Sequence, residues 1–345
     1  MTRLFGHEAP VAAFREGLAS NRLHHAWLLT GPRGVGKATF ANMAARRLLA
    51  QATGPQFEGE GLDVPASHPI ARLLDAESHP DFRLLERLPK DAKQREGLRK
   101  DRSGDEELAR SITVEQIRAL SKLFGSTPFL SPWRVAIIDS IDDLEPPAAN
   151  ALLKSLEEPP ANCLFLLVSH APAGLLPTIR SRCLNVRFGA LDDEAMTSAL
   201  KSVLPDLDAG ELAALVPAGD GAPGLALQRR GLDIGKLDDE LERLLREGDP
   251  YNRARGALAA KLALKAAQAR YEIFLSRVPR HIAAAAKTLT GSRRAAAIGA
   301  YERARALGDS AIGLSLDPAM VTFALAGLVA GLAPTGGDAP RRADG

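Results

Sequence analysis

The sequence predicts an N-terminal α/β domain with a parallel sheet, then a small helical lid and a third, all-helical domain. Two observations lead to this fold class. Short apolar segments alternate with helical stretches over residues 1–188, which is typical of a parallel α/β sheet. After Phe188 the pattern changes to helical segments rich in alanine, leucine and acidic residues. With 345 residues, the chain is long enough for two or three domains.

Each expected strand is short, apolar and bounded by turn or polar residues. The five segments are Trp27 to Thr30, Asp81 to Leu85, Arg134 to Asp139, Leu164 to Ser169 and Leu184 to Phe188. The expected domains are 1–188, a lid over 189–246 whose helices are broken at Pro205, Pro217 and Pro223, a helical domain over 249–333, and a disordered tail over 334–345. In the third domain we expect helices from Ala254 to Val278, Arg293 to Leu307 and Pro318 to Ala333.

Composition and charge argue against several classes of protein. The formal charge of +2 is too small for a protein that grips nucleic acid alone, so any DNA contact should be local or shared. Two cysteines, Cys163 and Cys183, suit a reducing compartment. No signal peptide is evident, and the longest apolar run, Ala319 to Ala333, falls short of the ~18 residues of a membrane span. We therefore expect a cytoplasmic protein without membrane contact.

The charged stretch from Pro89 to Glu107 contains residues of both signs, which favours a solvated loop over a DNA contact.

The most informative motif is a glycine-rich loop after the first strand. Gly31, Gly34, Gly36 and Lys37 form a GxxxxGK pattern, in which backbone N–H groups and the lysine ammonium hold nucleotide phosphates. The next residue is Ala38, where a Ser or Thr hydroxyl would bind Mg²⁺. Thr39 cannot simply replace it, because one residue along a helix turns the side chain by ~100°. We expect weakened Mg²⁺ binding, with phosphate binding left open.

The acidic site is also incomplete. Asp139 ends its strand and could hold a metal, but Ser140 follows where hydrolysis needs a carboxylate to activate water. Asp142, Asp143 and Glu145 lie beyond the strand, where solvated turn carboxylates are the simpler interpretation and a hidden base the other.

Two further strings carry a resemblance. The segment 149–160 reads ANALLKSLEEPP, and 178–183 reads TIRSRC after the fourth strand. Together with the loop, in matching order, they resemble the clamp-loader branch of the AAA+ ATPases over the whole first domain, and weakly over the lid. The resemblance implies an AAA+ fold, a C-terminal collar for oligomerisation, and partners: motor subunits, other loader subunits, a sliding clamp and primed DNA.

Departures from the family pattern refine this expectation. Motor subunits keep a hydroxyl after the loop lysine, an Asp-Glu pair and a lid Gly-x-x-Arg motif, where this sequence has Ala38, Asp139-Ser140 and Gly224. The resemblance then implies a subunit without catalytic activity of its own, whose Arg182 acts in trans as an arginine finger on a neighbour's ATP. Taken alone, Arg182 would only be a cation near a helix end.

Other positions remain open. Asn150 and Lys154 are interface or DNA-facing residues, or simply a solvated helix face. Family members often carry a four-cysteine zinc module before a His-Pro-Asp sequence; His79-Pro80-Asp81 is present without the cysteines, and His68 with His79 makes a poor site, so we expect no zinc.

Two alternatives to this non-hydrolysing subunit stay open. One is a true ATP-hydrolysing motor that draws on Thr39 and Asp142. The other is a passive scaffold in which Lys37 is a relic. Whether a structural ATP or ADP is bound also stays open, because the loop argues for it and Ala38 against tight Mg²⁺-ATP.

Overall fold

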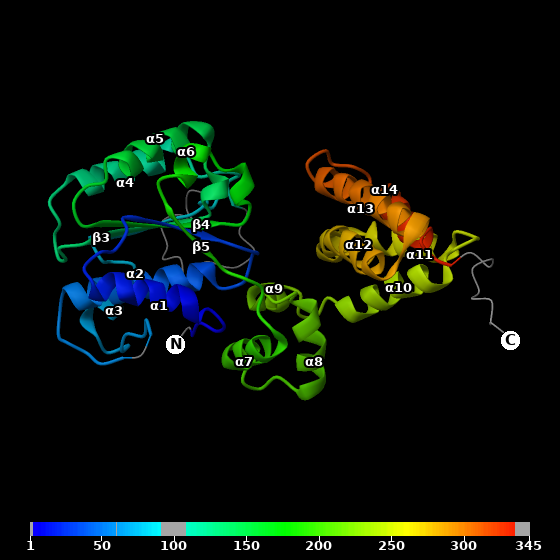
Figure 1. Cartoon of the computed structure of the whole chain (residues 1–345), viewed down its shortest axis with the longest axis horizontal. Coiled ribbons are helices and arrows are strands. Elements are labelled where there is room, and N and C mark those ends of the chain that lie inside the picture. Colours follow the sequence, from blue (N-terminus) through cyan, green and yellow to red (C-terminus); the bar gives the residue numbers. More distant parts are fainter. Residues whose placement is uncertain (1–2, 60, 91–107, 335–345) are drawn as a thin grey trace. The chain divides into compact units, whose positions relative to one another are not determined.

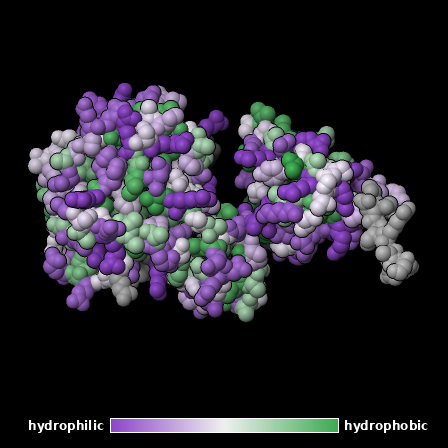
Figure 2. All heavy atoms as spheres, in the orientation of Figure 1, coloured by the Kyte–Doolittle hydropathy of each residue, from purple (hydrophilic) through white to green (hydrophobic). Residues whose placement is uncertain are grey.

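The computed structural model describes residues 3–59, 61–90 and 108–334. Contacts divide the chain into two compact units, Met1–Gln228 and Arg229–Gly345, each with its own core. Figure 1 traces the chain, and Figure 2 shows hydrophilic side chains over much of the viewed face of each unit. The expected loop from Pro89 to Glu107 and the expected tail fall largely in 91–107 and 335–345, outside the described residues.

The first unit is built on a parallel five-stranded sheet in the order β2-β3-β4-β1-β5. The predicted α/β fold class and all five predicted strands are confirmed, with no strand end shifted by more than one residue. The strands are β1 Ala26–Thr30, β2 Phe82–Leu85, β3 Arg134–Asp139, β4 Cys163–Ser169 and β5 Leu184–Arg187. Strand β4 is buried along its full length, because it lies between β3 and β1 and both of its faces are covered.

Helices cover both faces of the sheet, with α1 (Glu8–Ala19), α2 (Lys37–Ala52) and α3 (Pro69–Asp75) on one side. The other side holds α4 (Val114–Gly125), α5 (Pro146–Glu157) and α6 (Pro177–Arg180), as Figure 1 shows. Alternate strand residues enter the two cores: Trp27 and Leu29 face α2, whereas Leu28 and Phe165 face α4 and α5. This two-sided burial fixes the register and brings the loops after β1, β3 and β4 to one edge.

The lid contains α7 (Asp193–Val203), α8 (Ala209–Ala218) and α9 (Pro223–Gln228). Asp192 and Asp208 cap the first two helices by accepting backbone N–H groups. The expected break at Pro217 is not seen, because this proline lies in the last turn of α8, whereas Pro223 begins α9. A small apolar core around Met196 and Leu200 holds the three helices together.

The second unit is all helical, as predicted. Its helices are α10 (Ile234–Glu247), α11 (Arg253–Leu262), α12 (Gln268–Thr288), α13 (Gly291–Ala311) and α14 (Pro318–Ala330). Helix α10 lies within the lid range expected from the sequence, yet Leu237, Leu241 and Leu244 pack into the core of the second unit. The compact units therefore divide at Gln228, before α10, and not near residue 246.

The helix expected from Ala254 to Val278 is two helices. A short 3-10 turn at Lys265–Ala267 separates α11 from α12, and neither Pro nor Gly marks this break in the sequence. Buried Ala297, Ala300 and Ala304 let α13 approach α12 closely. None of the helices in the described ranges combines the length and apolar content needed to cross a membrane.

Candidate nucleotide-phosphate site

The phosphate loop runs from β1 into α2 and depends on glycines that make close backbone contacts. Gly31 has φ +146°, and a Cβ there would lie 2.1 Å from the carbonyl oxygen of Phe188. Gly34 has φ +77°, and a Cβ there would lie 2.7 Å from the backbone nitrogen of Leu225. Since only glycine tolerates both the angles and the contacts, the loop can lie against β5 on one side and the lid on the other.

Lys37 is the first residue of α2, and its side chain is turned into the loop. Its Nζ donates to the carbonyl oxygens of Gly31 and Pro32, both at 2.5 Å. Burial lowers the pKa of Lys37 to about 8, against the opposing charges of Asp139 and Asp142. The ammonium that would neutralise a phosphate is therefore already engaged by its own loop, and a phosphate would have to compete with two carbonyl oxygens.

The N-terminal segment braces the loop, which the sequence analysis missed. His7 is buried, its Nε2 donates to the carbonyl oxygen of Val35 at 2.9 Å, and its ring packs edge-on against Phe188. Burial lowers the pKa of His7 and favours the neutral ring. Leu4 packs on the core beneath the loop and Phe5 on the lid core. No motif in the sequence signals these contacts, because the His7–Val35 bond joins residues 28 positions apart and the His7–Phe188 contact joins residues about 180 positions apart.

Asp142 differs most from its expected role. Its Oδ1 accepts from Ser169 Oγ at 2.8 Å and from the Ala171 N–H at 3.3 Å. Its Oδ2 accepts from Ser140 Oγ at 2.9 Å and from the His170 N–H at 2.6 Å. Burial alone would raise the pKa of this carboxyl, but the four hydrogen bonds hold it below its ordinary value.

The interpretation of the turn acids as solvated carboxylates is therefore wrong for Asp142, whose two oxygens are both bound by donors. Besides the engaged Asp142, Asp143 pairs with Arg87 Nε at 3.3 Å and Glu145 accepts from Ser111 Oγ at 2.7 Å. With both oxygens bound by donors and a lowered pKa, Asp142 is a poor general base. It instead ties the end of β3 to the end of β4.

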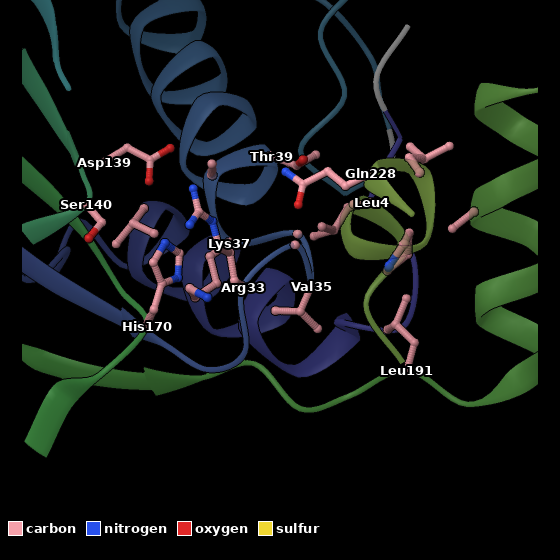
Figure 3. Close-up of a pocket in the computed structure, with 18 of the residues that line it drawn as sticks. Leu4, Arg33, Val35, Lys37, Thr39, Asp139, Ser140, His170, Leu191 and Gln228 are labelled. Atoms are coloured by element: carbon pink, nitrogen blue, oxygen red, sulfur yellow. The ribbon is translucent and has the colours of Figure 1, made fainter. Parts of the chain in front are cut away.

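A cavity of about 1060 Å³ lies beside the loop, and all its described lining residues belong to the first unit. Figure 3 shows its phosphate end, where Lys37, Asp139, Ser140 and His170 converge. Thr39 lines the cavity on the Gln228 side, away from Asp139. The lining also includes apolar side chains, among them Leu4, Leu191, Val203 and Leu227. A cavity that combines apolar lining with a cationic group has the layout of a nucleotide pocket.

The lid closes directly on the loop. The Gly224 N–H donates to the Gly34 carbonyl oxygen at 2.9 Å. A Cβ at Gly224 would lie 3.0 Å from Gly34 Cα, so a larger side chain here would push the lid away. Gly224 stands where the family's motor subunits have the lid arginine. This position therefore offers no side chain to a phosphate and instead makes a tight backbone contact with Gly34.

His170 is a second residue that the sequence analysis missed. It follows β4, lines the cavity and lies near Lys37 and Arg33 in Figure 3. Burial, followed by the charge of Lys37, lowers its pKa, so the ring is neutral near pH 7. Its Nδ1 is buried and has no hydrogen-bond partner among the described residues. A polar residue directly after a buried strand is the only sequence signal for it.

Arg182 lies away from this cavity. It follows α6, and its side chain is about one-third exposed. Its Nη1 donates to the Thr178 carbonyl oxygen at 3.0 Å, and its Nη2 lies 2.8 Å from Glu157 Oε1 at the end of α5. It does not belong to the described lining of the cavity beside the phosphate loop.

Two residues lie on the exposed face of α5. Asn150 and Lys154 are four residues apart and both exposed, while Leu152 and Leu156 are buried on the opposite face. Their positions leave the interface, DNA-facing and solvated interpretations all open. They lie on one helix face and away from the lining of the nucleotide cavity.

The histidines considered for zinc serve the backbone instead. His68 Nδ1 accepts from the Ile70 N–H and caps α3, while His79 Nδ1 accepts from the Asp81 N–H. Within 3–59, 61–90 and 108–334, no group of three or more His, Cys, Asp or Glu side chains is placed to hold a metal ion. Cys163 and Cys183 are buried free thiols, and burial raises the pKa of Cys183 to about 12.

The sheet order, the phosphate loop between β1 and α2 and the helical lid together define a P-loop protein of the AAA+ class. The family model described as "DNA polymerase III, delta subunit" matches residues 6–192, more than half of the chain. The chain belongs to this family. The predicted kinship with clamp-loader proteins is thereby confirmed.

Similarity to individual proteins supports this family assignment. The chain is 35% identical over 210 residues to DNA polymerase III subunit delta' of Pseudomonas aeruginosa, covering 61% of this chain and 57% of the relative. It is 31% identical over 183 residues to subunit delta' of Bacillus subtilis, covering 53% and 47%. A subunit gamma of Buchnera aphidicola is 28% identical over 202 residues, covering 59% and 48%. The chain thus spans about half the length of the curated relatives it matches.

Proposed function

We propose that this chain is a delta-prime-like stator subunit of a bacterial DNA polymerase III clamp loader. In this role it helps to load the sliding clamp onto primed DNA during replication and does not itself hydrolyse ATP. The observation that carries the proposal is the division between the two sites: the chain's own cavity has an engaged lysine and no free base at Asp142, while Arg182 is presented elsewhere on the surface.

Four features support the absence of hydrolysis. Ala38 offers no hydroxyl for Mg²⁺, and Ser140 stands where a catalytic carboxylate would be. Gly224 offers the lid's backbone in place of an arginine side chain. Asp142, which a motor would need as its base, is bound by four donors. The alternative of a gamma/tau-like motor therefore lacks its proposed base, and Thr39 lies on the side of the cavity away from Asp139.

The retained Arg182 supports a role in trans. A guanidinium that reaches a neighbour's γ-phosphate stabilises the charge of the phosphoryl-transfer transition state. The partners in this proposal are gamma/tau-like motor subunits and a delta-like subunit, with the sliding clamp and primed DNA reached through the complex in the cytoplasm. The helices of the second unit would form the collar, and Asn150 and Lys154 remain candidates for an interface or a DNA contact.

The test is the clamp- and DNA-stimulated ATPase of a reconstituted loader that contains this chain. We expect Arg182→Ala to cut turnover about tenfold or more, equivalent to about 1.4 kcal/mol of barrier, because the transition-state charge loses its partner. Lys37→Ala should have little effect, because this chain's own site is not turning over. Arg180→Ala is the matched control, because Arg180 is an exposed arginine at the end of α6, two residues before Arg182.

The reverse pattern would reject the stator. If Lys37→Ala removed a share of turnover and Arg182→Ala did not, the chain would be a motor. Equilibrium binding of ATP and ADP to the isolated subunit, with and without Mg²⁺, tests separately whether the cavity holds a structural nucleotide or whether Lys37 is a relic.

A further inference from the structure

An ion pair joins the two motifs on which the family resemblance rests. Arg182 Nη2 lies 2.8 Å from the Oε1 atom of Glu157, the first glutamate of the LEEPP string and the last residue of α5. The two residues are 25 positions apart in the sequence. Both side chains remain partly exposed, at 35% and 46%, so the pair lies at the surface where a neighbouring chain can reach the arginine.

The contacts define one orientation of a long side chain. Nη1 donates to the Thr178 carbonyl oxygen at 3.0 Å and to Ser181 Oγ at 3.4 Å, while Nη2 pairs with Glu157. The carboxyl end of α5 adds the negative end of its dipole beneath the cation. Since an unattached arginine side chain samples many rotamers, holding it in one of them lowers the entropy lost when it meets a phosphate.

The same contacts leave part of the guanidinium available. An arginine carries five N–H donors, and the Nε–H of Arg182 donates to no acceptor in the described parts of the chain. The pair is also partly exposed and made through a single carboxylate oxygen, so it is weak enough to yield. These properties suit a contact that orients the arginine and argue against one that locks it away.

We propose that Glu157 is a positioning residue, which holds Arg182 in the orientation from which it reaches the phosphate of a neighbouring subunit's ATP. This rests on the proposed role of Arg182 in trans. Glu158 provides a natural comparison, because it is adjacent, exposed and equally charged, and its side chain has no partner among the described residues.

The experiment measures kcat and KM for ATP in the reconstituted loader with Glu157→Ala, Glu158→Ala, Arg182→Ala and the double variant Glu157→Ala/Arg182→Ala. We expect Glu157→Ala to lower kcat by about two- to fivefold with KM unchanged, as suits an exposed ion pair. Glu158→Ala should match the wild type. The double variant should match Arg182→Ala, because Glu157 acts only through that arginine.

Two results would overturn the proposal while leaving the arginine finger intact. In one, Arg182→Ala cuts turnover but Glu157→Ala behaves like Glu158→Ala. In the other, Glu157→Ala causes a further loss in the Arg182→Ala background, which is the result expected from damaged folding or assembly. If Arg182→Ala itself leaves turnover unchanged, the proposed function fails, and the positioning role fails with it.

Discussion

At the scale of single residues, hydrogen bonding decides which carboxylates are available for chemistry. Asp142 is placed after a buried strand beside a phosphate loop, as a catalytic base would be, yet four donors occupy its oxygens. The acceptor that could activate water has become a structural tie between two strand ends. A sequence pattern identifies the carboxylate but not its partners, because Ser169 ends a strand 27 residues further along and His170 follows that strand.

The stability of the tie should depend on pH. The folded-state pKa of Asp142 is depressed, so the unfolded chain binds its proton first as pH falls. Its contribution is therefore complete above the ordinary Asp pKa of about 3.9 and is lost as pH falls through the folded value. Melting temperatures from pH 7 down to about pH 2 should show that Asp142→Asn flattens the loss of stability on the acid side.

At neutral pH, Asp142→Asn should also lower the free energy of unfolding by about 1–3 kcal/mol, because the NH₂ group of asparagine cannot accept the hydrogen bonds that one carboxylate oxygen accepts. Asp143→Asn is the matched control, since its partly exposed pair with Arg87 contributes about 0–1 kcal/mol. Equal effects of the two substitutions would contradict the assigned role of Asp142.

At the scale of elements, the lid and the phosphate loop form one backbone-to-backbone contact. The Gly224 N–H reaches the Gly34 carbonyl oxygen at 2.9 Å, and neither glycine has room for a Cβ in comfortable contact. Closure of the lid on this loop therefore depends on two small residues about 190 positions apart. Lys37 donates to the Gly31 carbonyl oxygen, and His7 donates to the Val35 carbonyl oxygen. Both hydrogen bonds favour one fixed conformation of the phosphate loop.

Gly34→Ala should disturb this contact. With φ at +77° and a Cβ 2.7 Å from the Leu225 nitrogen, alanine should cost about 1–3 kcal/mol of stability, measured by denaturant unfolding. Gly125→Ala is the control, because Gly125 lies in α4 with no atom within 4 Å of a new Cβ. That substitution should be neutral or stabilising by up to about 1 kcal/mol. A neutral Gly34→Ala would show that the lid does not rest on the loop.

At the scale of the whole molecule, apolar packing assigns each helix to a unit. Helix α10 follows the lid in sequence, but its leucines belong to the core formed with α12 and α14. The lid keeps only α7, α8 and α9 around its own smaller core. The division at Gln228 therefore follows the buried contacts of α10 and not the domain boundary near residue 246 that the sequence pattern predicted.

Hydrogen exchange can test this assignment in the full chain. Leu241→Ala removes a fully buried side chain and should cost about 2–5 kcal/mol, with faster exchange in α12 and α14 but not in α7 to α9. Leu200→Ala, equally buried in the lid core, should give the opposite distribution. Faster exchange in α8 and α9 upon Leu241→Ala would place α10 with the lid instead.

The sequence alone determined the features that depend on neighbouring residues. The five strands follow from short apolar runs, the phosphate loop from its glycine and lysine spacing, and the LEEPP and SRC strings from their own residues. Each of these signals lies within about a dozen positions, so local pattern is enough to recover them.

Only the tertiary structure decided which remote groups meet. Four contacts each join segments separated by 25 residues or more: the hydrogen-bonded carboxylate of Asp142 with His170, His7 with Val35, Gly224 with Gly34, and Glu157 with Arg182. Such contacts depend on the order of the strands and on which helix covers which face. Because that order is set by burial of the whole core, a local sequence pattern carries no record of these partners.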